Sequence, residues 1–317
     1  MQAEAIGITP DQPNASKNLH RTLKMQTMPN KNAALSTEQL KIQAARHHDP
    51  FSVLGLHDQA GQHSVCVFAP HTQSVSLPDY KISLPRIADS DFFYWQGDTQ
   101  ITAPYVVRYV MTDGRSKQFH DPYSLPPQLQ EYDLHLFGEG RHWHLYRILG
   151  AHHHQIPDIS GVLFATWAPN AERVSVVGDF NNWDGRCHPM RNRGQGGVWE
   201  LFIPGLNAGA LYKFEIRHRD SGEILTKADP YGQQFEIRPK TSSVVRKQET
   251  WHWADNTWMQ QRAQFDWLHQ PMSIYEVHLG SWQRDSDGGF LNYRELAHRL
   301  VSYLQTTGIT PILCWWQ

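Results

Sequence analysis

Alternating apolar and polar positions predict that most of the chain forms β-strands, after one short helix near its start. The helix is expected over residues 36–47, because Ser36 can cap its N-terminus and Asp49-Pro50 ends it. The β-rich runs that follow are residues 65–68, 75–77, 92–95 and 105–110.

Residues 161–240 repeat this order of strands and turns. The predicted strands of this second series are residues 162–167, 174–176, 198–203 and 211–216. In each series one strand ends at an Ala-Pro pair, beginning at Ala69 or Ala168, and an Asp-Pro-Tyr triplet closes the series at Asp121 or Asp229. Such an internal repeat predicts two similar β-sandwich domains in tandem, of Greek-key or immunoglobulin-like type.

The last part of the chain has a different pattern. A strand over residues 273–279 precedes a helical face formed by Leu296, Leu300, Tyr303 and Leu304, with Gly308 at the position of a C-cap. With the apolar run at 309–313 this is a β-α-β unit, which opens parallel α/β folds. A closed barrel needs about 250 residues, so we expect this segment to expose an apolar helix face and strand edges and to be disordered or prone to aggregate.

The patterns divide the chain into four parts. Residues 1–35 are polar and are expected to form a flexible tail. Residues 36–155 form the first β-sandwich module and residues 156–262 the second, with a histidine-rich run at the end of the first. Residues 263–317 carry the β-α-β unit.

Composition narrows the classes of function. The 317 residues include 29 Lys and Arg against 31 Asp and Glu, a net charge of −2, which argues against a nucleic-acid or anionic-membrane binder. The three cysteines, Cys66, Cys187 and Cys314, are too scattered for a disulfide framework. Without an apolar signal region or a spanning run, a cytoplasmic location is expected.

The histidine-rich segments do not predict a metal site. Adjacent residues His152, His153 and His154 on an extended segment point in different directions, and no cysteine or carboxylate set lies at ligand spacing. The chain also has no P-loop, GxGxxG, HExxH or GxSxG motif. We therefore expect neither a metal nor a cofactor.

The segment Gly-Asp-Phe-Asn-Asn-Trp-Asp-Gly at residues 178–185 is the most informative motif. Its density of Asn, Asp and Gly after a strand predicts a tight turn. Trp183 within it is either a plug in the core or an exposed platform for the apolar face of a sugar ring. The residues alone leave both alternatives open.

Several motifs resemble known carbohydrate-active enzymes. Residues 164–185, Leu-Tyr-Lys-Phe at 211–214 and Ala-Asp-Pro-Tyr at 228–231 resemble the glycogen-binding β-sandwich module of the α-amylase superfamily. The segments at 49–57, 138–140, 149–152, 273–282 and 293–297 are similar to bacterial glycogen branching enzymes, the last two to the first strand and helix of their barrel.

The resemblance implies a mainly β fold, with two tandem immunoglobulin-like β-sandwich modules before the truncated start of a (β/α)8 barrel. It also implies transfer of α-1,4-glucan segments to 6-hydroxyls by a retaining mechanism with two carboxyl groups. Those groups lie on later barrel strands, and neither Glu276 nor Glu295 matches them, so we expect no catalytic residue and no activity in these 317 residues. The expected partner is an α-glucan, bound by a monomer through Trp183 as platform with Lys213 and Asn182 beside it. The alternative is a non-catalytic β-sandwich scaffold or interaction module.

The end of the sequence departs from the family pattern. Residues 311–317 drift from the second barrel strand and include Trp315-Trp316, an unusual place for two large apolar side chains. We interpret this as a frame change or a premature stop in the gene.

Overall fold

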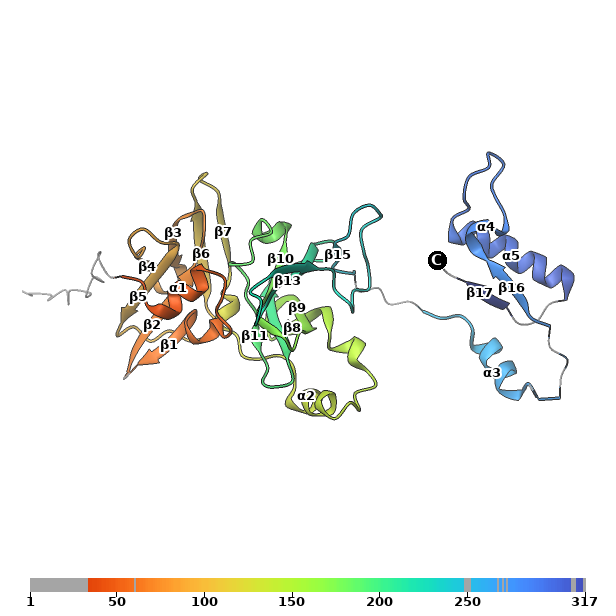
Figure 1. Cartoon of the computed structure of the whole chain (residues 1–317), viewed down its shortest axis with the longest axis horizontal. Coiled ribbons are helices and arrows are strands. Elements are labelled where there is room, and N and C mark those ends of the chain that lie inside the picture. Colours follow the sequence, from red (N-terminus) through yellow and green to blue (C-terminus); the bar gives the residue numbers. More distant parts are fainter. Residues whose placement is uncertain are drawn as a thin grey trace, which may run out of the picture. The chain divides into compact units, whose positions relative to one another are not determined.

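The computed structural model describes residues 34–59, 61–247, 252–266, 268–269, 271, 273–308 and 312–315. The chain divides into two compact units, Met1–Gln248 and Glu249–Gln317, and each is described by itself (Figure 1). Most of the predicted tail, as well as Trp316, lies outside the described residues.

The first β-region, residues 34–124, begins with helix α1 (Thr37–Gln43). Ser36 caps it as predicted, in a capping box with Gln39, but the helix is shorter than expected and ends at Ala44. The strands of this region are β1 (Gly55–Gln59), β2 (Gln62–Phe68), β3 (Thr72–Leu77), β4 (Ile82–Leu84), β5 (Phe92–Gly97), β6 (Val106–Met111) and β7 (Ser116–His120). They form two antiparallel sheets, β1-β2-β5 and β4-β3-β6-β7, around a core that includes Val65, Val75 and Trp95.

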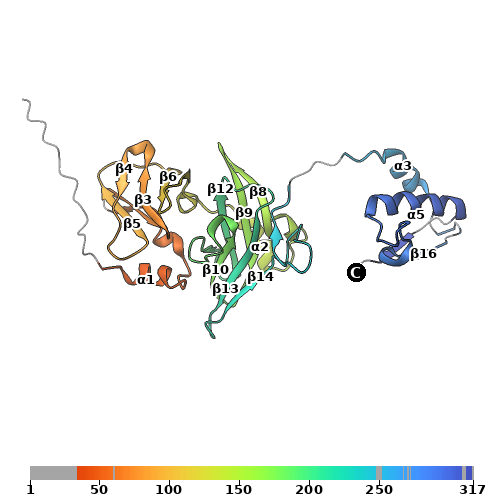
Figure 2. The same ribbon diagram turned by 90° about the horizontal axis from the view of Figure 1, so that it is seen from above.

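The second β-region, residues 125–247, contains helix α2 and eight strands. They are α2 (Glu131–Gly138), β8 (Gly150–Ile156), β9 (Ile159–Trp167), β10 (Ala171–Gly178), β11 (Arg191–Asn192), β12 (Val198–Pro204), β13 (Leu211–His218), β14 (Ile224–Lys227) and β15 (Ser243–Val244). One sheet has the order β11-β12-β9-β8; in the other, β13 pairs with β10, β14 and β15. Val162, Phe164 and Trp199 lie in the core of this region, whereas α2 packs Leu134 and Phe137 on the opposite face of β9 and β12 (Figure 2).

The predicted boundary at residue 155 falls inside β8. This strand pairs along its whole length with β9, so the histidine-rich run is part of the second β-region. All three histidines are hydrogen-bonded within the protein: the Nε2 atoms of His152, His153 and His154 donate to the Leu149 carbonyl, the Arg246 carbonyl and Gln128 Oε1, respectively.

The internal repeat extends to individual hydrogen bonds. The hydroxyl of Tyr105 donates to Asp121 at 2.6 Å, and the hydroxyl of Tyr212 donates to Asp229, also at 2.6 Å. In both Asp-Pro-Tyr triplets the other oxygen of the aspartate, Oδ1, accepts from the backbone N–H of the tyrosine two residues later. Each β-region is therefore closed by the same buried tyrosine–aspartate pair.

The buried Asp121 predicts a pH effect on stability. Burial raises its pKa from 3.8 to about 6, against the hydrogen bond from Tyr105, which lowers it. Between these values the folded state holds a proton that the unfolded state has released, so stability falls as the pH rises from 4 to 6, by roughly 3 kcal/mol in total. In urea unfolding between pH 4 and 7, Asp121→Asn should lack this contribution, whereas the exposed Asp79→Asn should follow the unsubstituted chain. An unchanged pH profile in Asp121→Asn would contradict the assignment.

The second unit contains α3 (Asn256–Gln264), β16 (Tyr275–His278), α4 (Leu279–Trp282), α5 (Tyr293–Thr307) and β17 (Ile312–Trp315), with β16 and β17 parallel. Gly308 ends α5 in the left-handed conformation, with φ of 68°, as predicted. The expected exposure of the helix face is wrong for its leucines. Leu296, Leu300 and Leu304 are buried against Val277 of β16, because the helix folds back on the strand. Among the described residues, no helix has the length and hydropathy of a membrane span.

Candidate functional site

The Asn-Asn-Trp loop leaves the end of β10 through a short 3-10 turn, Asp179–Asn181. Asn181 is buried and holds the loop from inside. Its Oδ1 accepts from the N–H of Gly178 at 2.9 Å, and its Nδ2 donates to the Val176 carbonyl and to His188 Nδ1, both at 2.8 Å. The first asparagine of the motif is therefore a structural residue.

Trp183 is held at the surface in a strained conformation. Asn182 and Trp183 both have positive φ angles, 56° and 59°, which bulky side chains rarely adopt. The indole Nε1 donates to Asp179 Oδ1 at 2.8 Å, and 36% of the residue is exposed. The sequence left two alternatives for Trp183, a plug in the core or an exposed platform. The exposed position of the side chain excludes the first. Strain of this kind is kept where the surrounding contacts fix it, often at functional sites.

Lys213 lies at the same end of the sheet as the loop. It pairs in register with Val177, one residue before the loop begins, and the N–H of Trp183 donates to the Gly178 carbonyl. Its Nζ donates to Thr241 Oγ1 at 2.8 Å. The structure thus brings all three predicted site residues to one end of the β10–β13 pair, with Lys213 held by Thr241.

Arg173 ties the far end of the loop to the sheet, and sequence reasoning missed it. Its side chain is 1% exposed and donates to Ser175 Oγ at 2.6 Å, to the Gly185 carbonyl at 3.1 Å and to Glu215 Oε1 at 2.6 Å. A Cβ on Gly185 would lie 1.9 Å from the same Glu215 oxygen, so only glycine fits there without displacing the ion pair. The sequence did contain one signal for this role, because Arg173 is a charged residue in an otherwise mainly apolar strand.

A cleft of about 590 Å³ separates the Asn-Asn-Trp loop from the first β-region. Asn182, Asp184 and His188 line it from the second region, and Tyr109 and Lys117 from the first. Burial lowers the pKa of His188 to about 4, so its imidazole is neutral at neutral pH.

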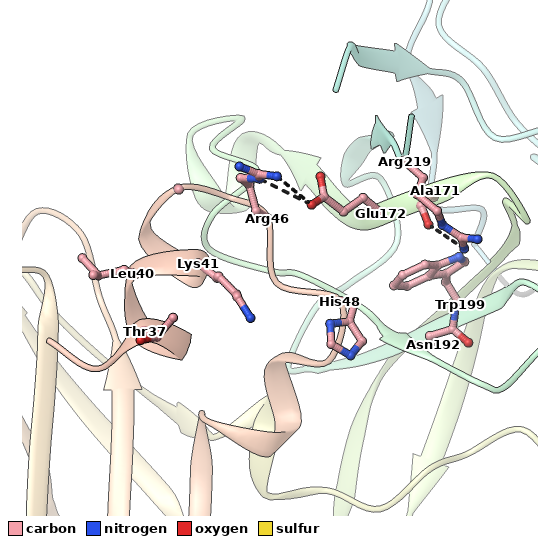
Figure 3. A pocket seen from close by; sticks show the side chains of 11 residues that line it. Thr37, Leu40, Lys41, Arg46, His48, Ala171, Glu172, Asn192, Trp199 and Arg219 are labelled. Carbon is pink, nitrogen blue, oxygen red and sulfur yellow. Dashed lines mark hydrogen bonds and ion pairs between the residues drawn. The ribbon is translucent and has the colours of Figure 1, made fainter. Parts of the chain in front are cut away.

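A second pocket, of about 640 Å³, lies between α1 and the edge of the second β-region (Figure 3). Its cationic groups are paired within the protein. Arg46 lies 3.3 Å from Glu172, Lys41 lies 2.8 Å from Glu38, and Arg219 donates to a backbone carbonyl at 3.4 Å. We assign this pocket to the junction between the two β-regions.

The next question is whether the described residues include a metal site or a reactive thiol. Among them, no three His, Cys, Asp or Glu side chains are grouped to hold a metal ion. Cys66 and Cys187 are free thiols, and burial raises the pKa of each to about 12, so neither is a reactive thiolate at neutral pH. The exposed aromatic loop is thus the best candidate for a binding site.

Comparison with known families defines the class of the two β-regions. Residues 148–232 match the family described as "Carbohydrate-binding module 48 (Isoamylase N-terminal domain)". Residues 36–123 match "alpha-1,4-glucan branching enzyme GlgB, N-terminal domain". The Asn-Asn-Trp loop, Lys213 and the buried Tyr212–Asp229 pair all lie within the carbohydrate-binding match.

Similar proteins of known name show more specifically which enzymes the chain resembles. The 1,4-alpha-glucan branching enzyme GlgB of Methylococcus capsulatus is 50% identical over 281 residues, covering 88% of this chain and 38% of that protein. The enzyme of the same name from Nitrosococcus oceani is 53% identical over 282 residues, with the same coverage. The predicted resemblance is confirmed: the chain is similar to the N-terminal portion of bacterial glycogen branching enzymes, and it spans about two fifths of their length.

The similarity of the chain to solved structures is low. A pullulanase type I from Bacillus subtilis, solved with maltose, covers 82% of this chain and 37% of its own, at 16% identity and a TM-score of 0.37. A likeness of this size carries no argument about function.

Proposed function

We propose that the second β-region is an α-glucan-binding module and that Trp183 is its stacking platform. The observation that carries the proposal is the exposed, strained indole fixed by Asp179. A flat aromatic face beside a few polar groups is the usual design of a saccharide site. The module match over residues 148–232 supports the same assignment.

Lys213 and Asn182 supply the polar groups of the proposed site. The ammonium group of Lys213 has three donors, of which Thr241 uses one, so two remain for sugar hydroxyls. The side-chain amide of Asn182 makes no hydrogen bond within the described part of the chain and can both donate and accept.

The remaining domain assignments belong to the same proposal. We place two immunoglobulin-like sandwiches at residues 36–124 and 125–247, moving the boundary from 155 because β8 pairs with β9. The unit from residue 249 supplies the start of the (β/α)8 barrel, which the parallel pairing of β16 and β17 around α5 supports. The cytoplasmic location and the monomeric state stay predictions.

The whole relatives are named as branching enzymes, and we propose that this chain is the non-catalytic, N-terminal part of such an enzyme. A retaining glucan transfer needs a nucleophilic carboxylate and a general acid, and the resemblance assigns neither to these 317 residues. Incubation of the chain with amylose should yield no new α-1,6 linkages by proton NMR. Their appearance, above a heat-denatured control, would contradict the proposal.

Retention on an amylose column tests the binding function itself. The chain should be retained and then released by free maltoheptaose, because the oligosaccharide competes for the same aromatic surface. Passage through the column without retention would instead favour the alternative, a β-sandwich scaffold that binds other proteins.

A further inference from the structure

The cleft between the two β-regions adjoins the proposed platform. Asn182 and Asp184, the neighbours of Trp183 on either side, both line it. Its volume of about 590 Å³ lies in the range of about 300–1,000 Å³ that ligand pockets occupy. A glucan chain that stacks on the indole would therefore reach the cleft at the residues next to Trp183.

The walls of the cleft are suited to sugar rings. Tyr109 and Phe119 of the first β-region lie edge to face, with ring centroids 4.9 Å apart, and Phe180 faces the cleft from the second region. Apolar aromatic walls of this kind bind the carbon faces of pyranose rings.

Some polar groups of the cleft are free to bind a ligand, and both of its carboxylates are already engaged within the protein. The side chain of Lys117, on the same face of β7 as Phe119, makes no hydrogen bond within the described part of the chain, like that of Asn182. His188 Nδ1 accepts from Asn181, so its Nε2 carries the proton of the neutral ring and can donate. Asp184 is paired with Arg186 at 2.7 Å, and Asp121 accepts from the Tyr105 hydroxyl at 2.6 Å. Among the described residues of the lining, the groups left to bind a ligand include the uncharged Asn182 and His188 and the cationic Lys117, and with two carboxylates nearby they match hydroxyl groups better than an anionic ligand.

The two β-regions are joined beside the cleft by direct contacts. The Tyr123 hydroxyl donates to the Pro189 carbonyl at 3.2 Å, and the Arg191 guanidinium lies 3.4 Å from the centre of the Phe51 ring. Because the walls are held in place before a ligand arrives, little ordering would oppose binding.

We propose that this cleft is a second section of the glucan site, in which the first β-region binds glucosyl units beyond those stacked on Trp183. The proposal rests on the proposed function of the second β-region. It gives the first β-region a part in carbohydrate recognition, with Lys117 as a hydrogen-bonding group for the longer chain.

Calorimetric titration of the full 317-residue chain with maltotriose and maltoheptaose tests the proposal. The variant Lys117→Ala should bind maltoheptaose about tenfold more weakly, the loss of one hydrogen bond from a charged donor, while its affinity for maltotriose stays unchanged. Gln73→Ala, an exposed glutamine of β3 outside the cleft lining, is the matched control and should bind both ligands normally.

The possible outcomes distinguish the proposal for the cleft from the proposal that Trp183 is a platform. If Lys117→Ala binds maltoheptaose as tightly as the unsubstituted chain while Trp183→Ala loses binding, the cleft is not part of the site and the platform stands. If the unsubstituted chain binds neither ligand, both proposals are overturned. Unchanged thermal midpoints of the variants will show that any loss is not caused by unfolding.

Discussion

Trp183→Ala should weaken maltoheptaose binding about thirtyfold without lowering the thermal midpoint of the chain. Buried aromatic anchors typically contribute about 2 kcal/mol or more to an interface, which corresponds to this factor. The fold should tolerate the change, because the indole is exposed and its Nε1 donates to Asp179 at the surface. Calorimetric titration with maltoheptaose measures the loss directly.

Two further variants sharpen this comparison. Trp183→Phe keeps a flat ring at the same position and should retain part of the affinity. Trp143→Ala removes another exposed tryptophan of the second β-region, 88% accessible and outside the loop, and should bind normally. Equal binding by Trp183→Ala and the unsubstituted chain would show that the platform role is wrong.

Arg173→Met should cause the largest loss of stability, about 3–5 kcal/mol in the second β-region, because removing one partner of a buried ion pair leaves the other without compensation. The variant keeps an apolar side chain in the core but deprives Glu215, Ser175 and the Gly185 carbonyl of their donor. Urea unfolding, read by hydrogen exchange over residues 171–218, measures the effect on this region separately from the first.

Arg217→Met is the matched control for that substitution. Arg217 lies in the same sheet and pairs with Glu172 at 2.7 Å, but its side chain is 20% exposed against 1% for Arg173. Pairs nearer the solvent contribute about 1 kcal/mol or less. Equal losses in the two variants would contradict the role assigned to the buried guanidinium, as would an Arg173→Met chain that unfolds like the unsubstituted one.

Local signals in the sequence predicted much of the fold. Ser36 and Gly308 mark helix ends because capping depends on residues within one turn. The order of strands in the two β-regions followed from alternation and turn residues. The boundary between the regions did not, because β8 is recognised by its pairing with β9, and its histidines show no alternation that a sequence pattern could detect.

The candidate site was predictable only in part. Asn181 and Asn182 are the same residue type in adjacent positions, yet one is buried with three hydrogen bonds and the other faces the cleft. Their roles differ because the backbone turns between them, which residue identity does not specify. Arg173 was missed because its partner Glu215 lies on another strand, and that proximity exists only in the folded sheet.

The most direct test of the account is an NMR titration of the tryptophan indole signals with maltoheptaose. The Trp183 indole signal, assigned by its loss in Trp183→Phe, should shift progressively and reach saturation. The indole signal of Trp199, which is buried and donates to the Ala168 carbonyl at 3.0 Å, should stay in place. A Trp183 signal that does not move at saturating glucan, while other signals do, would contradict the claim that this indole is the platform.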